Sequence, residues 1–146
     1  MNGWILYKNP IEESWETQKL VEEFEKQDVK IRVVNPNDVD IFVDREDRKS
    51  IIVGGKPSWL PDFVIPRTGS GTTYFIKAII RHLERLGVTL INGSHAIDTV
   101  KDKLYTQQIL AESNLPVPKT LLLKHPINLD WVEKHLNFPV IIKTLS

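Results

Sequence analysis

The chain has 146 residues with nineteen basic and nineteen acidic side chains, so its formal charge is zero, and it contains no cysteine. Zero net charge argues against a general affinity for nucleic acid or anionic membranes, and the lack of cysteine excludes disulfides, thiol nucleophiles and thiolate metal sites. Hydrophobic residues make up 41% of the chain, enough for a buried core, and no apolar segment has the length needed to span a bilayer. We therefore expect a folded cytoplasmic protein with one domain, or with one domain and part of a second.

The first ninety residues alternate strand and helix patterns. Four short apolar runs predict buried strands: Trp4–Tyr7, Val29–Val34, Asp62–Pro66 and Val88–Ile91. Between the first two, Ser14 caps a predicted helix that runs through about Gln27. Between the last two, an apolar stripe from Phe75 to Leu86 predicts a helix that Gly87 ends. The predicted fold class is α/β, with an open and mostly parallel sheet flanked by helices, because strands joined through helices favour right-handed parallel crossovers.

The segment between the second and third strands is less regular. Ile41–Val43 and Ile51–Val53 flank the charged run Asp44–Lys49, which predicts a hairpin with a solvated turn; a recognition loop is the alternative. Gly54 and Gly55 follow. They faintly resemble a phosphate loop, but no helix pattern comes after them, so a turn is the better interpretation.

Ligands of an open parallel sheet bind at the carboxyl ends of its strands, and two predicted loops lie there. The loop Arg67–Thr73 carries glycines that permit close backbone approach, and it leads into a helix N-terminus that offers amide donors to an anion. Arg67 is explained equally well as an anion ligand or as an ordinary surface arginine. In the second loop, Asn92–Ser94, we expect Ser94 to cap a helix.

The stretch from Val100 to Thr120 combines a helix pattern with a stiff hinge at Leu115–Pro118. If one helix runs from Ile97 to Ala111, it carries two opposed apolar faces, which predicts a helix sandwiched between two lobes. By the same geometry Lys103 lies about 60° from the main apolar stripe, at the rim of the buried surface. Either an anionic ligand or an ordinary snorkelling role accounts for it there.

Beyond the hinge the patterns predict a strand at Lys119–Leu123, a helix at Asn128–Asn137 and a very apolar strand at Pro139–Thr144. Lys143 stands near the end of that last strand, so we expect its ammonium group to point towards a cleft. A second lysine aimed at the same space as Lys103 is what a triphosphate pocket needs, since two point charges then oppose several phosphate charges.

Signals for other chemistry are weak. The four histidines have no metal-ligand spacing, no serine lies in a nucleophile elbow, and no carboxylate pair has a spacing that indicates acid–base work. We therefore predict no catalytic residue and no metal ligand within these 146 residues.

Six segments, in this order, resemble the ATP-grasp superfamily and, within it, the RimK-like ligases. They are Phe63–Gly69, the long helix after it, Ile91–Gly93, Lys101–Leu104, Leu115–Thr120 and Phe138–Lys143. RimK-like ligases add glutamate or similar amino acids to a peptide carboxyl end. The resemblance covers essentially the whole chain. It implies a pre-ATP-grasp domain at residues 1–94, a linking helix and proline hinge at 95–118, and the start of an ATP-grasp domain at 119–146.

The resemblance also implies a mechanism. Lys103 and Lys143 would contact the phosphates of ATP. As part of the ligase hypothesis, and not of the resemblance, we expect Arg67 to orient a substrate carboxylate. The full-length enzyme would use ATP and Mg²⁺ to make an acyl phosphate that an amine attacks. The family's mobile glycine-rich loop and metal ligands follow the position of Ser146, so we expect the 146-residue chain alone to be inactive. Expected partners are ATP, an amino acid and a peptide or protein carboxylate, without nucleic acid or membrane and with homo-oligomer formation left open.

A different class of function is a stand-alone, non-catalytic α/β binding module, meaning a degenerate or split ATP-grasp protein. A receiver or flavodoxin-like domain also fits the strand–helix order. It ranks third, because Lys8–Pro10 after the first strand has neither an acidic cluster nor a phosphate loop. A continuation beyond Ser146 with a glycine-rich loop would favour the ligase, and a stop codon there would favour the module.

Overall fold

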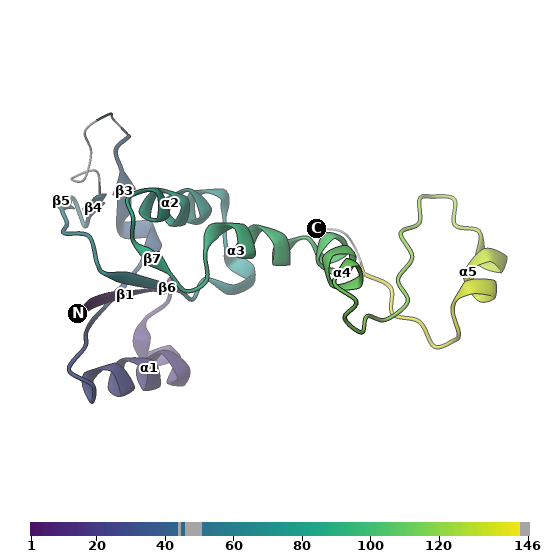
Figure 1. Cartoon of the computed structure of the whole chain (residues 1–146), viewed down its shortest axis with the longest axis horizontal. Helices are drawn as coiled ribbons and strands as arrows, with labels where there is room; N and C mark the ends of the chain where they lie inside the picture. Colours follow the sequence, from purple (N-terminus) through teal and green to yellow (C-terminus); the bar gives the residue numbers. More distant parts are fainter. Residues whose placement is uncertain (44, 46–50, 144–146) are drawn as a thin grey trace. The chain divides into compact units, whose positions relative to one another are not determined.

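The computed structural model describes residues 1–43, 45 and 51–143, and Figure 1 draws the whole chain. The chain divides into two compact units, Met1–Ile97 and Asp98–Ser146, each of which is described by itself. The predicted charged turn Asp44–Lys49 lies, apart from Arg45, outside the described residues.

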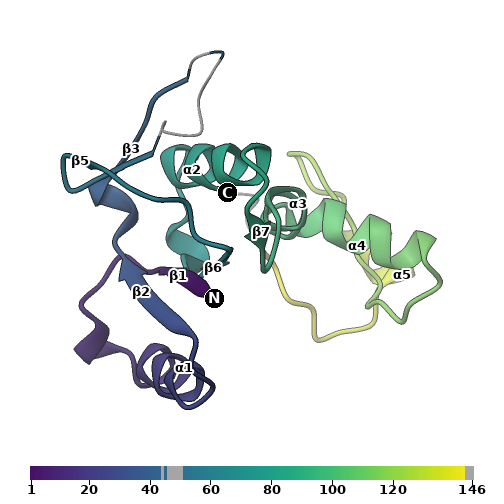
Figure 2. The ribbon, with the colours of Figure 1, turned by 60° about the vertical axis from the view of Figure 1, so that its left-hand side comes forward.

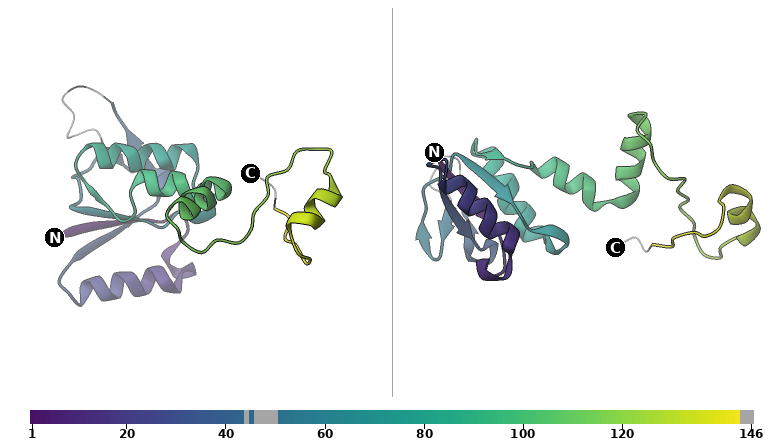
Figure 3. Two further views of the ribbon diagram at one scale, coloured as in Figure 1. Left: turned by 45° about the vertical axis from the view of Figure 1, so that its right-hand side comes forward. Right: turned by 90° about the horizontal axis from the view of Figure 1, so that it is seen from below.

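The first unit is built on a four-stranded parallel sheet with the order β2-β1-β6-β7. The strands are β1 (Asn2–Leu6), β2 (Lys30–Val34), β6 (Phe63–Pro66) and β7 (Thr89–Leu90). Helix α1 (Trp15–Glu25) joins β1 to β2, and α2 (Tyr74–Arg85) joins β6 to β7. The two helices cover opposite faces of the sheet (Figure 1, Figure 3). The predicted α/β class and all four predicted strands are confirmed, with ends shifted by one or two residues.

The helix ends follow local chemistry. Ser14 caps α1 as predicted: its Oγ accepts a hydrogen bond from the backbone N–H of Thr17 at 3.2 Å. Thr73 caps α2 in the same way through Ile76. After α2 the chain reverses at Gly87, whose φ of 84° is a left-handed conformation that glycine adopts without a steric cost.

A second, antiparallel sheet of three short strands packs beside α2 (Figure 2). Its strands are β3 (Val39–Ile41), β4 (Ile51–Val53) and β5 (Lys56–Pro57). The predicted hairpin is confirmed as the β3–β4 pair, and its second strand is Ile51–Val53 as predicted, but the first strand is Val39–Ile41 rather than Ile41–Val43. Strand β5 was not predicted from the sequence. Gly54 and Gly55 have φ values of 60° and 74°, which a tight β-hairpin turn requires, so the predicted turn holds there.

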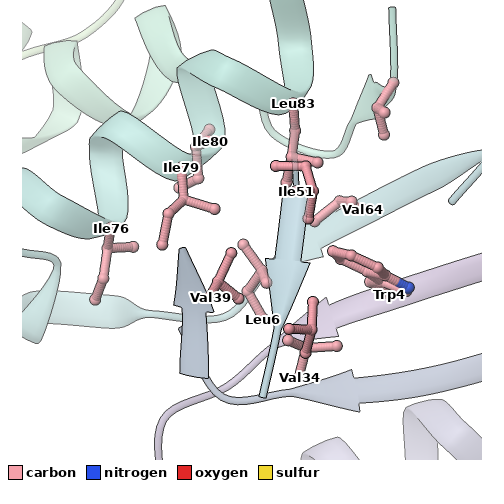
Figure 4. Packing of buried hydrophobic residues seen from close by; sticks show 12 residues of the cluster. Trp4, Leu6, Val34, Val39, Ile51, Val64, Ile76, Ile79, Ile80 and Leu83 are labelled. Atoms are coloured by element: carbon pink, nitrogen blue, oxygen red, sulfur yellow. The ribbon is translucent and has the colours of Figure 1, made fainter. Parts of the chain in front are cut away.

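The core lies between one face of the parallel sheet, the buried side of α2 and the small antiparallel sheet. The strands of the parallel sheet supply Trp4, Leu6, Val34 and Val64, α2 supplies Ile76, Ile79, Ile80 and Leu83, and the small sheet supplies Val39, Ile51 and Val53 (Figure 4). Because side chains alternate along a strand, Ile5 faces the other side of the sheet, where α1 packs. All of these side chains are buried.

On the α1 side of the sheet, a close backbone approach explains one glycine. Gly3 of β1 is paired with Phe63 of β6, and a Cβ at position 3 would lie 2.6 and 2.7 Å from two ring carbons of Phe63. The Phe63 ring cannot retreat freely, because it is buried and packs against Phe24 of α1 with ring centroids 5.5 Å apart.

We therefore expect Gly3→Ala to lower the free energy of unfolding by about 1–3 kcal/mol, the usual cost of overpacking a core. Urea denaturation of the 146-residue chain measures it. In a Phe63→Leu background the smaller side chain should absorb most of the added methyl group, so the same substitution should cost clearly less. An equal loss of stability in both backgrounds would show that contact with the Phe63 ring is not the cause.

The second unit has fewer buried residues. Its helices are α4 (Lys103–Glu112) and α5 (Leu129–His135), and α3 (Ser94–Lys101) crosses the boundary between the two units. Helix α5 confirms the predicted helix at Asn128–Asn137, with Asn128 as its cap. Among the described residues of this unit, Val132 is the only buried hydrophobic side chain.

Two predicted strands of this unit are wrong in the described residues. Residues 119–123 and 139–143 form no strand, and Ile141 and Ile142 are 85% and 87% exposed; Thr144 lies outside the described residues. A strand needs a neighbour to pair its N–H and C=O groups, and no described residue of this unit belongs to a strand. Apolar composition alone therefore could not make these segments into strands.

Candidate functional site

The carboxyl edge of the parallel sheet holds the candidate site of the first unit. From β1 the chain crosses to β2 on one side, while β6 and β7 lie on the other, so the strand order reverses between β1 and β6. Open α/β sheets bind ligands at such a switch point, outside the carboxyl ends of the strands. The loops that begin at Tyr7 and at Arg67 both leave the sheet at this edge.

Arg67 is held at this edge by the sheet itself. Its backbone N–H donates to the carbonyl of Leu6 at 2.9 Å and so extends the β1–β6 pairing by one residue. The side chain is half-buried, and its Nε is fully buried with no hydrogen-bond partner in the part of the chain that the structure describes. Burying a guanidinium nitrogen without a hydrogen-bond acceptor costs free energy. This cost favours the interpretation of Arg67 as an anion ligand over that of an ordinary surface arginine.

The rest of the loop is locked by hydroxyl groups. The Oγ1 atoms of Thr68 and Thr72 lie 2.6 Å apart in a buried hydrogen bond, and Thr72 Oγ1 also donates to the carbonyl of Gly69 at 2.7 Å. A short 3₁₀ turn at Gly69–Gly71 results. At Gly71 an added Cβ would collide with Nζ of Lys8, so the Lys8 ammonium group rests directly on the glycine backbone.

Glu16 brings a carboxylate to the same edge. It lies in the first turn of α1, where the Ser14 hydroxyl donates to its Oε2 at 3.2 Å. A backbone hydrogen bond, then that of Ser14 and, more weakly, the charge of Arg67 hold the pKa of Glu16 below its usual value, while partial desolvation opposes them. Glu16 is therefore ionised at neutral pH. Neither it nor Lys8 was a predicted site residue: their patterns are those of a helix start and of a turn.

Lys103 lies differently from what the helix pattern predicted. The expected single helix from Ile97 to Ala111 is wrong: the chain forms α3 and α4, which are separated at Asp102. Asp102 has extended backbone angles, and its Oδ1 accepts the N–H of Tyr105 at 2.9 Å, so it caps a new helix. Lys103 is the first residue of α4 and is exposed.

A side chain of α4 also stabilises the break between α3 and α4. Thr106 Oγ1 donates to the carbonyl of Thr99 at 2.9 Å and to that of Asp102 at 2.8 Å. The predicted pair of opposed apolar faces spans this break, so it does not describe one helix. No residue of α3 or α4 is buried. Ser94 is the first residue of α3 rather than its cap, and its hydroxyl donates to Glu84.

Lys143, the other predicted phosphate ligand, is exposed in a segment without regular structure. Neither Lys103 nor Lys143 forms an ion pair with any described residue, so both ammonium groups are open to a ligand. Arg67 belongs to the first unit and the two lysines to the second. That the three side chains meet one nucleotide and one substrate stays a prediction.

Two other features are absent from the ranges that the structure describes. No three histidine, aspartate or glutamate side chains among these residues come together as a metal site. None of the described helices has the length and apolar character of a membrane span.

Comparison with known families decides the class of the first unit. The family model for the RimK PreATP-grasp domain matches residues 1–97, about two thirds of the chain. The chain belongs to this family. The predicted resemblance to RimK-like ATP-grasp proteins is thereby confirmed, and the RimK PreATP-grasp domain coincides with the first compact unit, Met1–Ile97.

Curated relatives of this RimK-family chain are named as ligases. A probable alpha-L-glutamate ligase 1 of Shewanella amazonensis is 31% identical over 143 residues, one of Marinomonas sp. is 33% identical over 144, and one of Legionella pneumophila strain Corby is 32% identical over 143. Each match covers 97% of this chain but only 46–47% of the relative. The chain therefore spans about half the length of the curated relatives it matches.

Solved structures agree on the fold. A RimK domain ATP-grasp protein of Sphaerobacter thermophilus superposes with a TM-score of 0.59 at 15% identity, covering 82% of this chain and 40% of that one. The ATP-grasp ligase PsnB, complexed with a minimal precursor, Mg and ADP, gives a TM-score of 0.60 at 17% identity and covers 82% of this chain and 46% of that one. At these identities the likeness establishes the ATP-grasp fold relationship alone.

Proposed function

We propose that this chain is the N-terminal part of an ATP-dependent carboxylate–amine ligase that joins glutamate or another amino acid to the carboxyl end of a peptide or protein. The observation that carries the proposal is the match of residues 1–97 to the RimK PreATP-grasp domain, together with ligase relatives whose similarity extends over 97% of the chain. PsnB is complexed with a minimal precursor, Mg and ADP in one solved structure and with a precursor peptide in another, which supports a peptide substrate and ATP chemistry for this chain as well.

The reaction has two steps. A carboxylate oxygen of the substrate attacks the terminal phosphorus of ATP, the bond to the bridging oxygen breaks, and ADP leaves. The amine then attacks the acyl carbon of the acyl phosphate, phosphate departs with the bonding electron pair, and the amine loses a proton as the amide forms. The enzyme contributes by positioning the reactants and by stabilising the charge that moves.

Within this chain, we assign the phosphates of ATP to Lys103 and Lys143 and the substrate carboxylate to Arg67. Two exposed ammonium groups without ion-pair partners among the described residues suit phosphate oxygens, because each supplies a full point charge and rotatable donors. Arg67 suits a carboxylate because its guanidinium is a planar, bidentate donor.

Magnesium does not fit the described residues. Mg²⁺ takes oxygen ligands in octahedral geometry, and no three acidic or histidine side chains among these residues come together. We therefore route no step of this chain through the metal. The ligands belong, in our proposal, to the half of the relatives' length that this chain does not span, and the complete ligase works in the cytoplasm.

The alternative function is that of a non-catalytic binding module. The first unit has its own well-packed core, which is compatible with such a module. Calorimetry with ATP and Mg²⁺ on the 146-residue chain, beside the full-length protein, separates the two. The ligase proposal expects Mg²⁺-dependent ATP binding in the full-length protein, with ADP formed only when an amino acid and a peptide are present. For the 146-residue chain it expects binding weaker by at least about a hundredfold, since in our proposal the metal ligands and most of the nucleotide pocket belong to the half of the relatives' length that this chain does not span. A full-length protein that binds no ATP would refute it.

A further inference from the structure

Two cations at the carboxyl edge of the first unit have no counter-charge in hydrogen-bonding contact. Neither the ammonium group of Lys8 nor the guanidinium group of Arg67 forms an ion pair or a hydrogen bond with any residue in the described ranges, and the buried Nε of Arg67 lacks an acceptor. The charge of Arg67 acts on Glu16 and helps to lower the pKa of that carboxyl group, although no hydrogen bond joins the two side chains in the described ranges. Elsewhere in this unit, the exposed lysines Lys19, on α1, and Lys26, at the C-cap of α1, do pair with glutamates.

The sheet brings the two loops that carry these cations to the same edge. Leu6 and Pro66 are partners in the β1–β6 register, and the hydrogen bond from Arg67 N–H to the Leu6 carbonyl carries that register one residue further. Lys8 follows two residues after Leu6, so both loops leave the same edge of adjacent strands. Parallel strands lie about 4.8 Å apart, so the two loops begin close enough for one small ligand to contact both.

The ammonium group of Lys8, an exposed residue, lies against Gly71. Its Nζ occupies the space that a Cβ at position 71 would fill, and the turn that carries Gly71 is locked by the buried Thr68–Thr72 hydroxyl pair. A solvent-seeking lysine would extend away from the backbone. This one lies against Gly71, within the loop that begins with Arg67.

The balance of charge indicates which ligand fits. Lys8 and Arg67 contribute two positive charges, and the ionised Glu16 contributes one negative charge, so the cluster has a net charge of +1. This balance matches a carboxylate better than a phosphate dianion, which Glu16 would repel. A guanidinium beside an ammonium group also presents the donors that the two oxygens of one carboxylate accept.

We propose that Lys8 and Arg67 bind a carboxylate group at the edge between β1 and β6, with Gly71 seating the ammonium of Lys8 and Glu16 facing the group that carries the carboxylate. Two ligands share this chemistry: a free amino acid, whose ammonium group pairs with Glu16, and the carboxyl end of a peptide, which has no such ammonium nearby. That the carboxylate is a ligase substrate rests on the proposed function, whereas its binding to this unit does not.

The test is an NMR titration of the ¹⁵N-labelled 146-residue chain with L-glutamate, N-acetyl-L-glutamate and inorganic phosphate, without ATP. L-Glutamate should shift the amide signals of residues 7–9, 15–17 and 67–72. Arg67→Gln should weaken its binding by about tenfold or more, the usual value of a charge-assisted hydrogen bond, and Lys8→Gln should weaken it in the same direction. Arg81→Gln and Lys30→Gln remove equal charges from exposed positions elsewhere and should leave the affinity unchanged.

Gly71→Ala is the decisive variant, because it keeps every charge and displaces only the Lys8 ammonium. It should weaken glutamate binding several-fold while thermal unfolding stays close to that of the wild type. Lys8→Gln in the Gly71→Ala background should then add little. The role of Gly71 is refuted if the weaker glutamate binding of Gly71→Ala is fully explained by a smaller folded fraction. It is also refuted if Lys8→Gln lowers the glutamate affinity equally with Gly71 and with Ala at position 71.

Glu16→Gln identifies the source of the carboxylate. Weaker binding of L-glutamate with unchanged binding of N-acetyl-L-glutamate supports a free amino acid. Tighter or equal binding of both supports a peptide carboxyl end. The proposal is overturned if neither carboxylate shifts these signals, if phosphate binds more tightly than both, or if Arg67→Gln binds as the wild type does. None of these readouts depends on ATP turnover, so a failed ligase assay would leave them intact.

Discussion

Lys143→Ala in the full-length protein is expected to reduce ATP turnover by about 10²–10³-fold while the protein stays folded, the loss found when one preorganised charge-stabilising donor is removed from a transition state. In our proposal the ammonium group of Lys143 offsets the charge on the phosphoryl group during transfer. Lys103→Ala should act in the same direction, and the double variant should lose less than the product of the two effects, because both lysines serve one triphosphate.

ADP release, followed in the presence of glutamate and an acceptor peptide, measures these losses. Lys124→Ala is the matched control, since Lys124 is an exposed lysine of the same unit with no assigned role. Because Lys143 is itself exposed, its substitution should leave the unfolding transition within about 0.5 kcal/mol of the wild type. Turnover in Lys143→Ala equal to that of the wild type would contradict the assignment of this residue, and with it the phosphate role that we give to the second unit.

Ile79→Ala should lower the free energy of unfolding of the first unit by about 2–5 kcal/mol. Ile79 is fully buried at the centre of α2, between the parallel sheet and the small antiparallel sheet, and truncation leaves a cavity that rigid neighbours such as Leu6 and Val39 cannot fill. For a unit of about a hundred residues each kcal/mol corresponds to roughly 4–8 °C in melting temperature.

The chain offers the same substitution at an exposed site as a control. Ile142 is 87% exposed, so Ile142→Ala removes no buried contact in the 146-residue chain and should change stability by less than about 0.5 kcal/mol. Urea denaturation followed by circular dichroism compares both variants. Similar costs for the two would show that burial in the first unit does not decide stability, contrary to what the core implies.

The difference in burial between Ile79 and Ile142 also holds for the two units that contain them. In the first unit, apolar patterns and burial agree: the predicted strand runs and the α2 stripe are the residues that form the core. In the described part of the second unit, the most apolar run, Val140–Ile142, has no neighbour strand to pair with. An apolar pattern predicts which face of a segment becomes buried. The burial stabilises the segment only when a neighbouring strand or helix packs against that face.

The helix break at Asp102 is a second feature that the apolar spacing did not predict. Spacing from Ile97 to Ala111 is compatible with one helix, because a one-residue interruption shifts the helical phase without removing the apolar residues. The signal that would have placed the break is local: an aspartate whose side chain can accept the N–H three residues later, as Asp102 does from Tyr105. Lys103 is therefore a helix-start residue, and its place on a buried rim was wrong.

The sequence by itself determined the α/β class, the order of strands and helices in the first unit, the cap at Ser14 and the family of the chain. The first three depend on residues close together along the chain, where propensity, capping and alternation act locally, and the family depends on the order of six short segments. Only the tertiary structure brought Lys8 to Gly71 and Glu16 near Arg67, across about fifty residues or more of sequence. The strand register of β1 and β6 sets that meeting, and register is decided by which faces pack together rather than by any short stretch of residues.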